Sequence, residues 1–225
     1  MKLLFLNNYH YLRGGSEQVY FGEMDILKAK GHEVQAFARR TDRDISSRFS
    51  SLFPQDMTTD SLSAGPGAFR TIKEIIYSSE SKKQLDRILE EYQPDIVHAH
   101  NIYGRLTTSV LDLLNKKDIP VVMTLHDYKL VCPSYKLMYG DRVCEDCQGR
   151  HFYHAVKNRC HKDSLAASCI YAFESWFNSF FKKYISNVDF FISPSRFLRE
   201  KLLEFGWPEE KVVYIPNYIV SREFE

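Results

Sequence analysis

Short apolar runs alternate with stretches of helical spacing along most of the chain, and this alternation is typical of α/β proteins. The first run, residues 2–7, is almost wholly apolar, as expected of a strand that helices cover on both faces. Further strands are predicted at 33–38, 95–100, 119–125, 188–193 and 211–215. The spacing predicts helices over 16–30, 69–92 with a break near 78–81, 105–117, 164–186 and 195–205.

Repeated strand–helix–strand units fold with right-handed crossovers, so the strands should form one parallel sheet. We therefore predict an α/β fold: a Rossmann-like doubly wound parallel sheet with helices on both faces, in a single domain over residues 1–220. Two segments interrupt the alternation. The polar stretch 39–67 is predicted to be mostly loop, and residues 128–163 form an irregular insert that holds four of the five cysteines.

Composition narrows the classes of function. Among 225 residues, 30 Lys and Arg face 29 Asp and Glu, so the formal net charge is +1 and no basic excess drives nucleic-acid binding. No run approaches the roughly 18 apolar residues of a membrane span, and the first residues lack the features of a secretory signal. The odd count of 5 cysteines suggests a reducing compartment, so we expect a cytoplasmic protein.

Ligands of a doubly wound sheet bind beyond the carboxyl ends of its strands. Gly14 and Gly15 follow the first predicted strand and open a helix. Glycine there lets a ligand approach the backbone, and the free N–H groups of a helix start favour an anion. A plain turn from strand to helix explains the same pair equally well. Neither the three-glycine pattern of dinucleotide-binding domains nor the P-loop pattern is present.

Histidines follow the third and fourth predicted strands. His100 and Asn101 end one run, and His126 and Asp127 end the next. Histidine titrates near neutral pH and donates hydrogen bonds, so histidines at this edge are candidates for catalysis, and His126 is the stronger one. His98 lies within its strand and is expected to be a core residue.

Five short motifs, taken in order, resemble glycosyltransferase family 4, whose members have the GT-B fold. They are GGSE at 14–17, PDIVHAHN at 94–101, TLHDY at 124–128, SPS at 193–195 and IPN at 215–217. The resemblance runs over residues 1–220 and corresponds to the amino-terminal, acceptor-side half of such an enzyme. The family's donor-binding Rossmann domain follows the IPN motif and is absent from this sequence, so the isolated chain is expected to be inactive.

The resemblance implies a retaining transferase that moves a sugar from a nucleotide-diphosphate sugar to a glycan or a lipid-linked acceptor, without a catalytic metal. It implies that Gly14 and Gly15 border the donor diphosphate. His126 would be a catalytic residue beside the donor sugar, and Asp127 would orient the same loop. The cleft for donor and acceptor would be lined by His100, Asn101, Ser193 and Ser195.

A stand-alone binding module is the alternative function: a Rossmann-like domain that recognises a sugar or a protein without catalysis. A periplasmic-type binding protein is disfavoured because an export signal is missing. A second α/β domain beyond residue 225 would favour the enzyme over the binding module.

The insert could hold a structural zinc ion. Its cysteines are spaced C-x11-C-x2-C-x12-C, and they are Cys132, Cys144, Cys147 and Cys160. The central pair has the spacing of a zinc knuckle, and four thiolates suit tetrahedral zinc. Four reduced thiols, or a disulfide, remain open as the alternative. Nearby histidines could replace a thiolate, namely His151, His154 and His161.

The predicted helix 164–186 is rich in aromatic residues. A stripe at spacings of three and four runs along it, made of Cys169, Phe173, Trp176, Phe177, Phe180 and Tyr184. Such a stripe is typical of a core-facing side, and Cys169 should then be buried. The alternative is an interfacial helix with Lys182 and Lys183 toward lipid headgroups, which would give peripheral contact with the inner face of a membrane.

Overall fold

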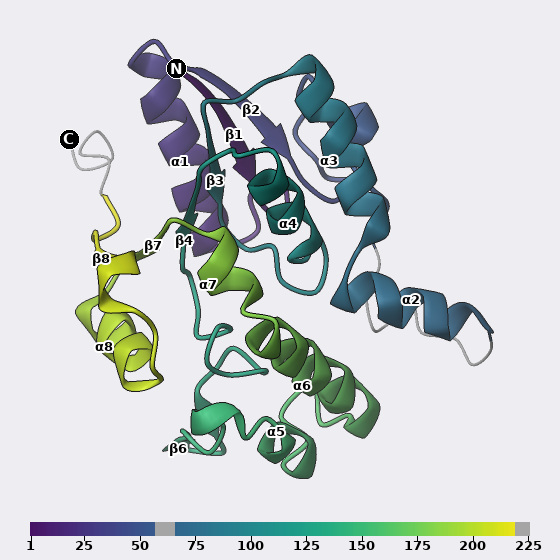
Figure 1. Cartoon of the computed structure of the whole chain (residues 1–225), viewed down its shortest axis with the longest axis vertical. Coiled ribbons are helices and arrows are strands. Elements are labelled where there is room, and N and C mark those ends of the chain that lie inside the picture. The colour runs from purple at the N-terminus through teal and green to yellow at the C-terminus, as the bar shows by residue number, and fades with distance from the viewer. Residues whose placement is uncertain (57–65, 219–225) are drawn as a thin grey trace.

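Six parallel strands form the central sheet within residues 1–56 and 66–218, the part of the chain that the computed structural model describes (Figure 1). Their order is β2-β1-β3-β4-β7-β8, and every neighbouring pair is parallel. The strands are β1 (Lys2–Leu6), β2 (Glu33–Phe37), β3 (Ile96–Ala99), β4 (Val121–Thr124), β7 (Phe190–Ser193) and β8 (Val212–Tyr214). The predicted doubly wound parallel sheet is therefore confirmed.

Helices cover both faces of this sheet, as right-handed crossovers require. The chain steps back from β1 to β2 through α1 (Gly15–Ala29), which therefore lies on the face opposite α3 (Ser79–Glu91) and α4 (Ser109–Lys116) (Figure 1). Tyr20 of α1 packs edge-on against Phe5 of β1, with ring centroids 5.9 Å apart. The other described α-helices are α2 (Pro66–Ile76), α5 (Tyr153–Lys157), α6 (Leu165–Phe180), α7 (Lys183–Asn187) and α8 (Arg196–Glu204). Short 3₁₀ turns are η1 (Ser50–Leu52), η3 (Gln148–Arg150) and η4 (Glu209–Lys211).

The insert, residues 128–163, contains little regular structure and lies below the carboxyl edge of the sheet (Figure 1). It holds the short helix α5 and a two-stranded hairpin of β5 (Met138–Tyr139) and β6 (Arg142–Val143). Lys201 of α8 pairs with Glu145 of the insert at 2.7 Å. The insert is therefore tied to the main domain partly by charge.

Helix ends differ from the predicted ones in two places. The predicted helix 164–186 is two helices, α6 and α7, because Lys182 between them adopts a left-handed backbone with φ of 50°. The predicted helix 105–117 starts later, with α4. The break predicted within the second helix is confirmed, between α2 and α3. Of the predicted loop, residues 57–65 lie outside the described residues, and Pro66 already begins α2.

A buried ion pair determines which side of α6 faces the protein. Glu174 and Lys129 are 2% and 7% exposed, and the Lys129 Nζ lies 2.7 Å from the Glu174 Oε2. Asn178, one turn further along α6, donates to the Glu174 Oε1 at 2.8 Å and accepts from the Thr108 Oγ1 at 2.7 Å. Because a buried charge must be paired, the polar side of α6 faces Lys129 of the insert and Thr108 before α4.

The opposite side of α6 faces outward and is wholly apolar. Its exposed residues are Leu165, Ala166, Cys169, Phe173, Trp176 and Phe180. The prediction that the stripe packs in the core, with Cys169 buried, is therefore wrong for Cys169 and for three aromatic residues, which are 42–58% exposed. Phe177 is half-buried against Tyr77, and Tyr184 is buried. The outward turn follows from the pairing of Glu174 on the other side of the helix.

We expect Glu174→Ala to lower the free energy of unfolding by about 3–5 kcal/mol, because it leaves the Lys129 ammonium buried without its partner. Replacing both residues, with Lys129→Met and Glu174→Leu, should restore most of that loss, since no charge then stays buried. Urea unfolding followed by circular dichroism measures both. Asp25→Ala, in the exposed Lys28–Asp25 pair, is the matched control and should change stability by less than about 0.5 kcal/mol. A Glu174→Ala loss as small as that of the control would contradict this account.

Candidate functional site

Asparagine residues tie the carboxyl ends of β1 and β3 together. Asn7 and Asn8, which follow β1 directly, are buried. The Asn101 backbone N–H donates to the Asn7 Oδ1 at 3.1 Å, and the Asn8 backbone N–H donates to the Asn101 carbonyl at 2.7 Å. The predicted cleft residue Asn101 thus belongs to a structural link. Asn7 and Asn8 are not among the predicted site residues, although polar residues directly after a buried strand are a signal of this edge.

Three histidines gather at the same edge, on the face that α1 covers. The ring centroids of His98 and His100 are 4.5 Å apart, and those of His100 and His126 are 5.2 Å apart. The His100 Nδ1 lies 2.9 Å from the His126 Nε2, within hydrogen-bond distance. His98 bonds through its Nε2 to the Thr124 Oγ1 at 2.8 Å. His126 is therefore held in place by His100, which is fully buried.

Glu23 of α1 joins the histidines, and none of the motifs points to it. Its Oε2 lies 3.4 Å from the His100 Nε2 and 3.5 Å from the His98 Nδ1. The Glu23 Oε2 and the His100 Nε2 are both buried without a hydrogen bond to any described residue. Within the described part of the chain, these three residues form the one group whose metal-ligating atoms all lie within 4.8 Å of one another. The arrangement can hold a proton or a cation. The feature of the sequence that could have indicated Glu23 is its position on α1 between the buried Tyr20 and Met24.

Burial keeps the histidines of this group neutral. It lowers the pKa of His126 to about 4 and the pKa of His98 to about 3, and it lowers the pKa of His100 well below its usual range. Burial also raises the pKa of Glu23, while the nearby imidazoles oppose that rise. At neutral pH the contacts between Glu23 and the rings are therefore not pairs of two charged groups, and His126 is an uncharged donor or acceptor of hydrogen bonds.

Asp127 shapes the loop that follows β4. Its Oδ1 accepts a hydrogen bond from the Lys129 backbone N–H at 2.9 Å, which is typical of an Asx turn. Burial raises the pKa of the Asp127 carboxyl, and the hydrogen bond from Lys129 opposes the rise. This geometry is compatible with an orienting role for Asp127.

Gly14 and Gly15 lie at the start of α1. A Cβ built on Gly15 would meet nothing within 4 Å, so the surroundings of this residue are open. No side chain caps the helix, which leaves the first N–H groups for water or a ligand. The Glu17 carboxylate in this turn is buried, and its Oε1 accepts from the Ser16 Oγ at 3.0 Å and from the Asn7 side chain at 3.4 Å.

Ser193 and Ser195 hold the turn between β7 and α8. Ser193 is fully buried, and its hydroxyl donates to the Ser195 carbonyl at 2.8 Å. The Ser195 Oγ accepts from the Leu198 backbone N–H at 3.1 Å and so caps α8. Both hydroxyls already have partners in the protein, and their place in a ligand cleft stays a prediction.

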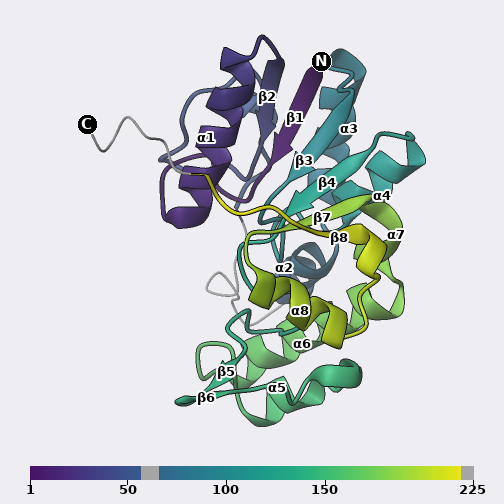
Figure 2. The ribbon, with the colours of Figure 1, turned by 90° about the vertical axis from the view of Figure 1, so that its left-hand side faces the viewer.

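The segment after β8 returns across the sheet to α1 (Figure 2). The Tyr218 hydroxyl donates to the Val19 carbonyl at 3.1 Å. A Cβ on Gly22 would overlap the Tyr218 hydroxyl, so a larger residue there would displace the end of this side chain. The IPN motif at 215–217 therefore leads the chain toward the helix that carries Glu23.

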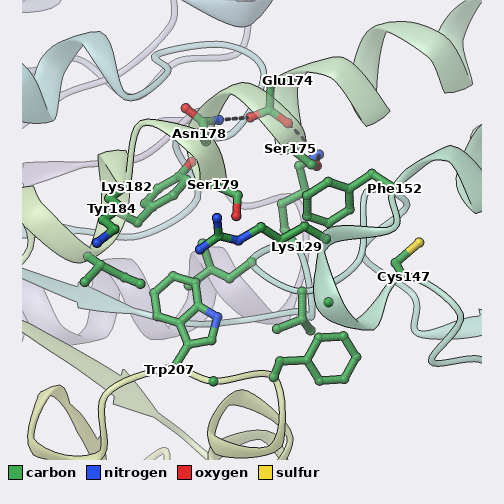
Figure 3. Close-up of a pocket in the computed structure, with 17 residues that line it drawn as sticks. Lys129, Cys147, Phe152, Glu174, Ser175, Asn178, Ser179, Lys182, Tyr184 and Trp207 are labelled. Atoms are coloured by element: carbon green, nitrogen blue, oxygen red, sulfur yellow. Dashed lines mark hydrogen bonds and ion pairs between the residues drawn. The ribbon is translucent and has the colours of Figure 1, made fainter.

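A recess of about 180 Å³ lies between the insert, α6 and the loop after α8 (Figure 3). The polar side of α6 forms one wall, with Ser175, Asn178 and Ser179, and Trp207 lies on the other side. The Tyr184 hydroxyl is buried there without a hydrogen bond to a described residue. The recess is smaller than the roughly 300 Å³ at the low end of ligand pockets, so it suits a small polar group rather than a whole substrate.

The four insert cysteines surround one small cavity. It is lined by Cys132, Cys144, Cys147 and Cys160, together with His154 but neither His151 nor His161. All four thiols are free, and burial together with the other three cysteines raises the pKa of Cys147 to about 12. Among the described residues, no three of these sulfur atoms lie within 4.8 Å of one another. The predicted ligands therefore converge on one place without the short distances of a metal-bound set.

Acid should destabilise the chain because of the buried histidines. Below about pH 6.5 the unfolded chain takes up protons that folded His98 and His126 accept only near pH 3 and 4, so the free energy of unfolding falls as the pH falls. The pKa values of Glu23 and Asp127 are raised, so these two carboxyl groups add stability as the pH falls. The three buried histidines, His98, His100 and His126, outnumber them. We expect Tm to be several degrees lower at about pH 5 than at about pH 7.5, because each kcal/mol lost lowers Tm by about 2–4 °C.

His98→Asn should make this pH dependence smaller, because it removes one of the buried titrating groups. His151→Asn, at an exposed position in the insert, is the control and should leave the difference in Tm unchanged. Differential scanning calorimetry measures both variants. Equal Tm values for the parent chain at the two pH values would show that the histidines do not govern acid stability.

A comparison with protein-family models matches residues 13–221 to Glycosyltransferase Family 4. No curated protein sequence matches the chain at a significant level. Similarity to solved structures extends over nearly the whole chain but at low identity. A UDP-N-acetylglucosamine 2-epimerase from Rickettsia bellii aligns with 96% of this chain and 45% of its own length, at 10% identity and a TM-score of 0.49.

Two further structures give similar values. MurG from Acinetobacter baumannii aligns with 98% of this chain and 46% of its own, at 11% identity and a TM-score of 0.46. The catalytic domain of starch synthase IV from Arabidopsis thaliana, bound to ADP and acarbose, aligns with 99% of this chain and 52% of its own, at 15% identity and a TM-score of 0.48. The chain thus spans about half the length of these structures. Since the family match covers most of its residues, the chain belongs to Glycosyltransferase Family 4.

Proposed function

We propose that the chain is the acceptor-side half of a retaining glycosyltransferase, which moves a sugar from a nucleotide-diphosphate sugar to a glycan or a lipid-linked acceptor. The observation that carries the proposal is the family match over residues 13–221. Placement of the site residues supports it, because Gly15, His126 and Asp127 all lie at the carboxyl edge of the sheet, where ligands of this fold class bind. A second domain would bind the nucleotide, so the isolated chain would be inactive.

His126 would act on the donor sugar as an uncharged imidazole. With a pKa of about 4 the ring carries no charge at neutral pH, so it would stabilise the reacting centre through a hydrogen bond. His100 would be a positioning residue, because it is buried and acts through its 2.9 Å contact with His126. The open N–H groups at Gly14 and Gly15 would approach the donor diphosphate.

The proposed transfer would proceed on one face of the sugar. The acceptor hydroxyl would form a bond to the anomeric carbon while the bond to the diphosphate breaks, and the leaving diphosphate would take the hydroxyl proton. No metal takes part in this step. Asp127 would keep His126 at the edge through the turn that it closes with Lys129.

In the enzyme that joins this chain to its donor-binding domain, His126→Ala should lower turnover by about 10²–10⁴-fold, the usual cost of a lost catalytic side chain, with little change in Tm. The measurement is release of nucleoside diphosphate from a panel of nucleotide sugars. His32→Ala, at the opposite edge of the sheet, is the control and should keep full activity.

Two results would contradict the proposal. If His126→Ala unfolds the protein while folded molecules keep full activity, the histidine is structural. If no nucleotide sugar is turned over while the protein binds a free sugar or a protein partner, the chain is a binding module.

We also propose that Cys132, Cys144, Cys147 and Cys160 hold a structural zinc ion in the insert. Four soft thiol ligands around one cavity, with His154 beside them, suit zinc in number and kind. The sulfur atoms would draw closer on binding, because thiolates lie about 2.3 Å from zinc. Zinc bound there would fix a segment that contains little regular structure, and a reducing compartment would keep the thiols available.

Protein purified without added metal should contain about one zinc ion per chain by elemental analysis, since four thiolates form a closed site. Cys147→Ser should remove most of that zinc, and Cys169→Ser should not, because Cys169 lies exposed on α6 away from the cavity. Chelation should increase hydrogen exchange in residues 128–163 and leave the sheet protected. Absence of zinc, with four thiols alkylated under reducing conditions, would disprove the site.

A further inference from the structure

Helix α6 has the reverse of the usual pattern of a surface helix, with charged and polar residues on its buried side and apolar residues on its exposed side. Its buried side carries Glu174 and Asn178, whereas its exposed side carries a continuous row of aromatic rings in mutual contact. We call this row the aromatic face, made of Phe173, Trp176, Phe180 and Phe181. Successive ring centroids lie 5.6, 5.1 and 5.0 Å apart. Exposed large apolar side chains that form one contiguous row indicate a binding surface.

The exposed charged residues of α2 and of the segment that carries the aromatic face are basic. Lys182 follows it directly and is exposed. Helix α2 lies beside α6 in Figure 1, and Tyr77, the residue after α2, contacts Phe177 of α6. Arg70 and Lys73 of α2 are exposed. Every exposed charged residue in segments 66–76 and 165–183 is basic, while the acids Glu74 and Glu174 are buried. A surface that combines aromatic rings with basic residues complements anionic lipid headgroups.

The size of the aromatic face favours a bilayer over a second copy of the chain. Four aromatic side chains that are about half exposed offer roughly 300–500 Å². A stable protein interface needs about 800 Å² on each partner. A bilayer surface has no such requirement, since rings and basic side chains insert singly into the headgroup region. The 16-residue helix could lie flat there, and among the described residues no helix is long and apolar enough to cross a bilayer.

We propose that the chain docks on anionic membranes through the aromatic face of α6, with Arg70, Lys73 and Lys182 on the headgroups. The polar side of α6 then faces away from the lipid, toward Lys129 and the recess shown in Figure 3. The paired charge of Glu174 holds this orientation. The inference does not depend on the proposed transferase activity, although a lipid-linked acceptor would reach such a surface from the same membrane.

Trp176 provides a direct test, because the chain has 2 tryptophans and the other, Trp207, packs on Phe191 with centroids 5.0 Å apart. Trp207→Phe leaves Trp176 as the one tryptophan. Its emission should shift to the blue with mixed phosphatidylcholine–phosphatidylglycerol vesicles, and lipids brominated on the upper acyl chain should quench it. Pure phosphatidylcholine vesicles should give a much weaker response, and added salt should weaken binding to the anionic ones.

Variants then identify the surface by co-sedimentation with the same vesicles. Phe173→Ser with Phe180→Ser should lower the partition coefficient at least about tenfold, because each lost ring removes apolar contact. Arg70→Gln with Lys73→Gln should lower it roughly fivefold per charge on anionic vesicles only. Phe197→Ser, at an aromatic residue of α8 that is 48% exposed, is the matched control and should bind as the parent does. Circular dichroism confirms that each variant is folded.

Three outcomes would overturn the proposal. The first is no blue shift and no quenching of Trp176 with anionic vesicles, a measurement that alters no residue of the face. The second is binding that the Phe173 and Phe180 substitutions leave unchanged in folded protein. The third is a dimer, seen by analytical ultracentrifugation, that Trp176→Ser dissociates while vesicles bind neither form, which would assign the face to a second copy of the chain.

Discussion

Burial of the Glu174 carboxylate is the constraint on which the region between β4 and β7 depends. A carboxylate taken out of water must be paired, and Lys129 and Asn178 contact it directly, while Thr108 donates to Asn178. Together they join the insert, α6 and the start of α4, and they fix the rotation of α6 about its axis. Consequently, the helix presents a polar wall to the recess of Figure 3 and its aromatic rings to the outside.

The Glu174–Lys129 pair is connected to the candidate site through Asp127. Lys129, which pairs with Glu174, also donates its backbone N–H to Asp127, directly after His126. On its other side, His126 contacts the buried His100, which lies close to Glu23 of α1. His126 is therefore positioned from both faces of the sheet, and its neutral state results from burial among groups that are themselves shifted toward neutrality.

The function of the chain is inferred from its family and from the residues at the carboxyl edge of its sheet. The family match gives the family of the chain, and the structure shows which of its residues lie at the carboxyl edge of the sheet. Of the predicted site residues, His100 and His126 come together, whereas Ser193 and Ser195 bond to the turn before α8. The cysteines converge on a separate cavity in the insert.

The amino-acid sequence by itself determined that the strands form a parallel sheet and that His100 and His126 lie at its carboxyl edge, because strand runs, crossover handedness and strand ends are local or general properties. The spacing of the cysteines also indicated which four of them lie around one cavity. Only the tertiary structure decided the partners of His126 and the direction of α6. Glu23 belongs to a helix distant in sequence, and a stripe of aromatic residues looks the same whether it faces the core or the outside. The orientation was decided by where Lys129 and Thr108 meet the other side of the helix, because the Glu174 carboxylate and the Asn178 amide are buried there against partners from segments distant in sequence.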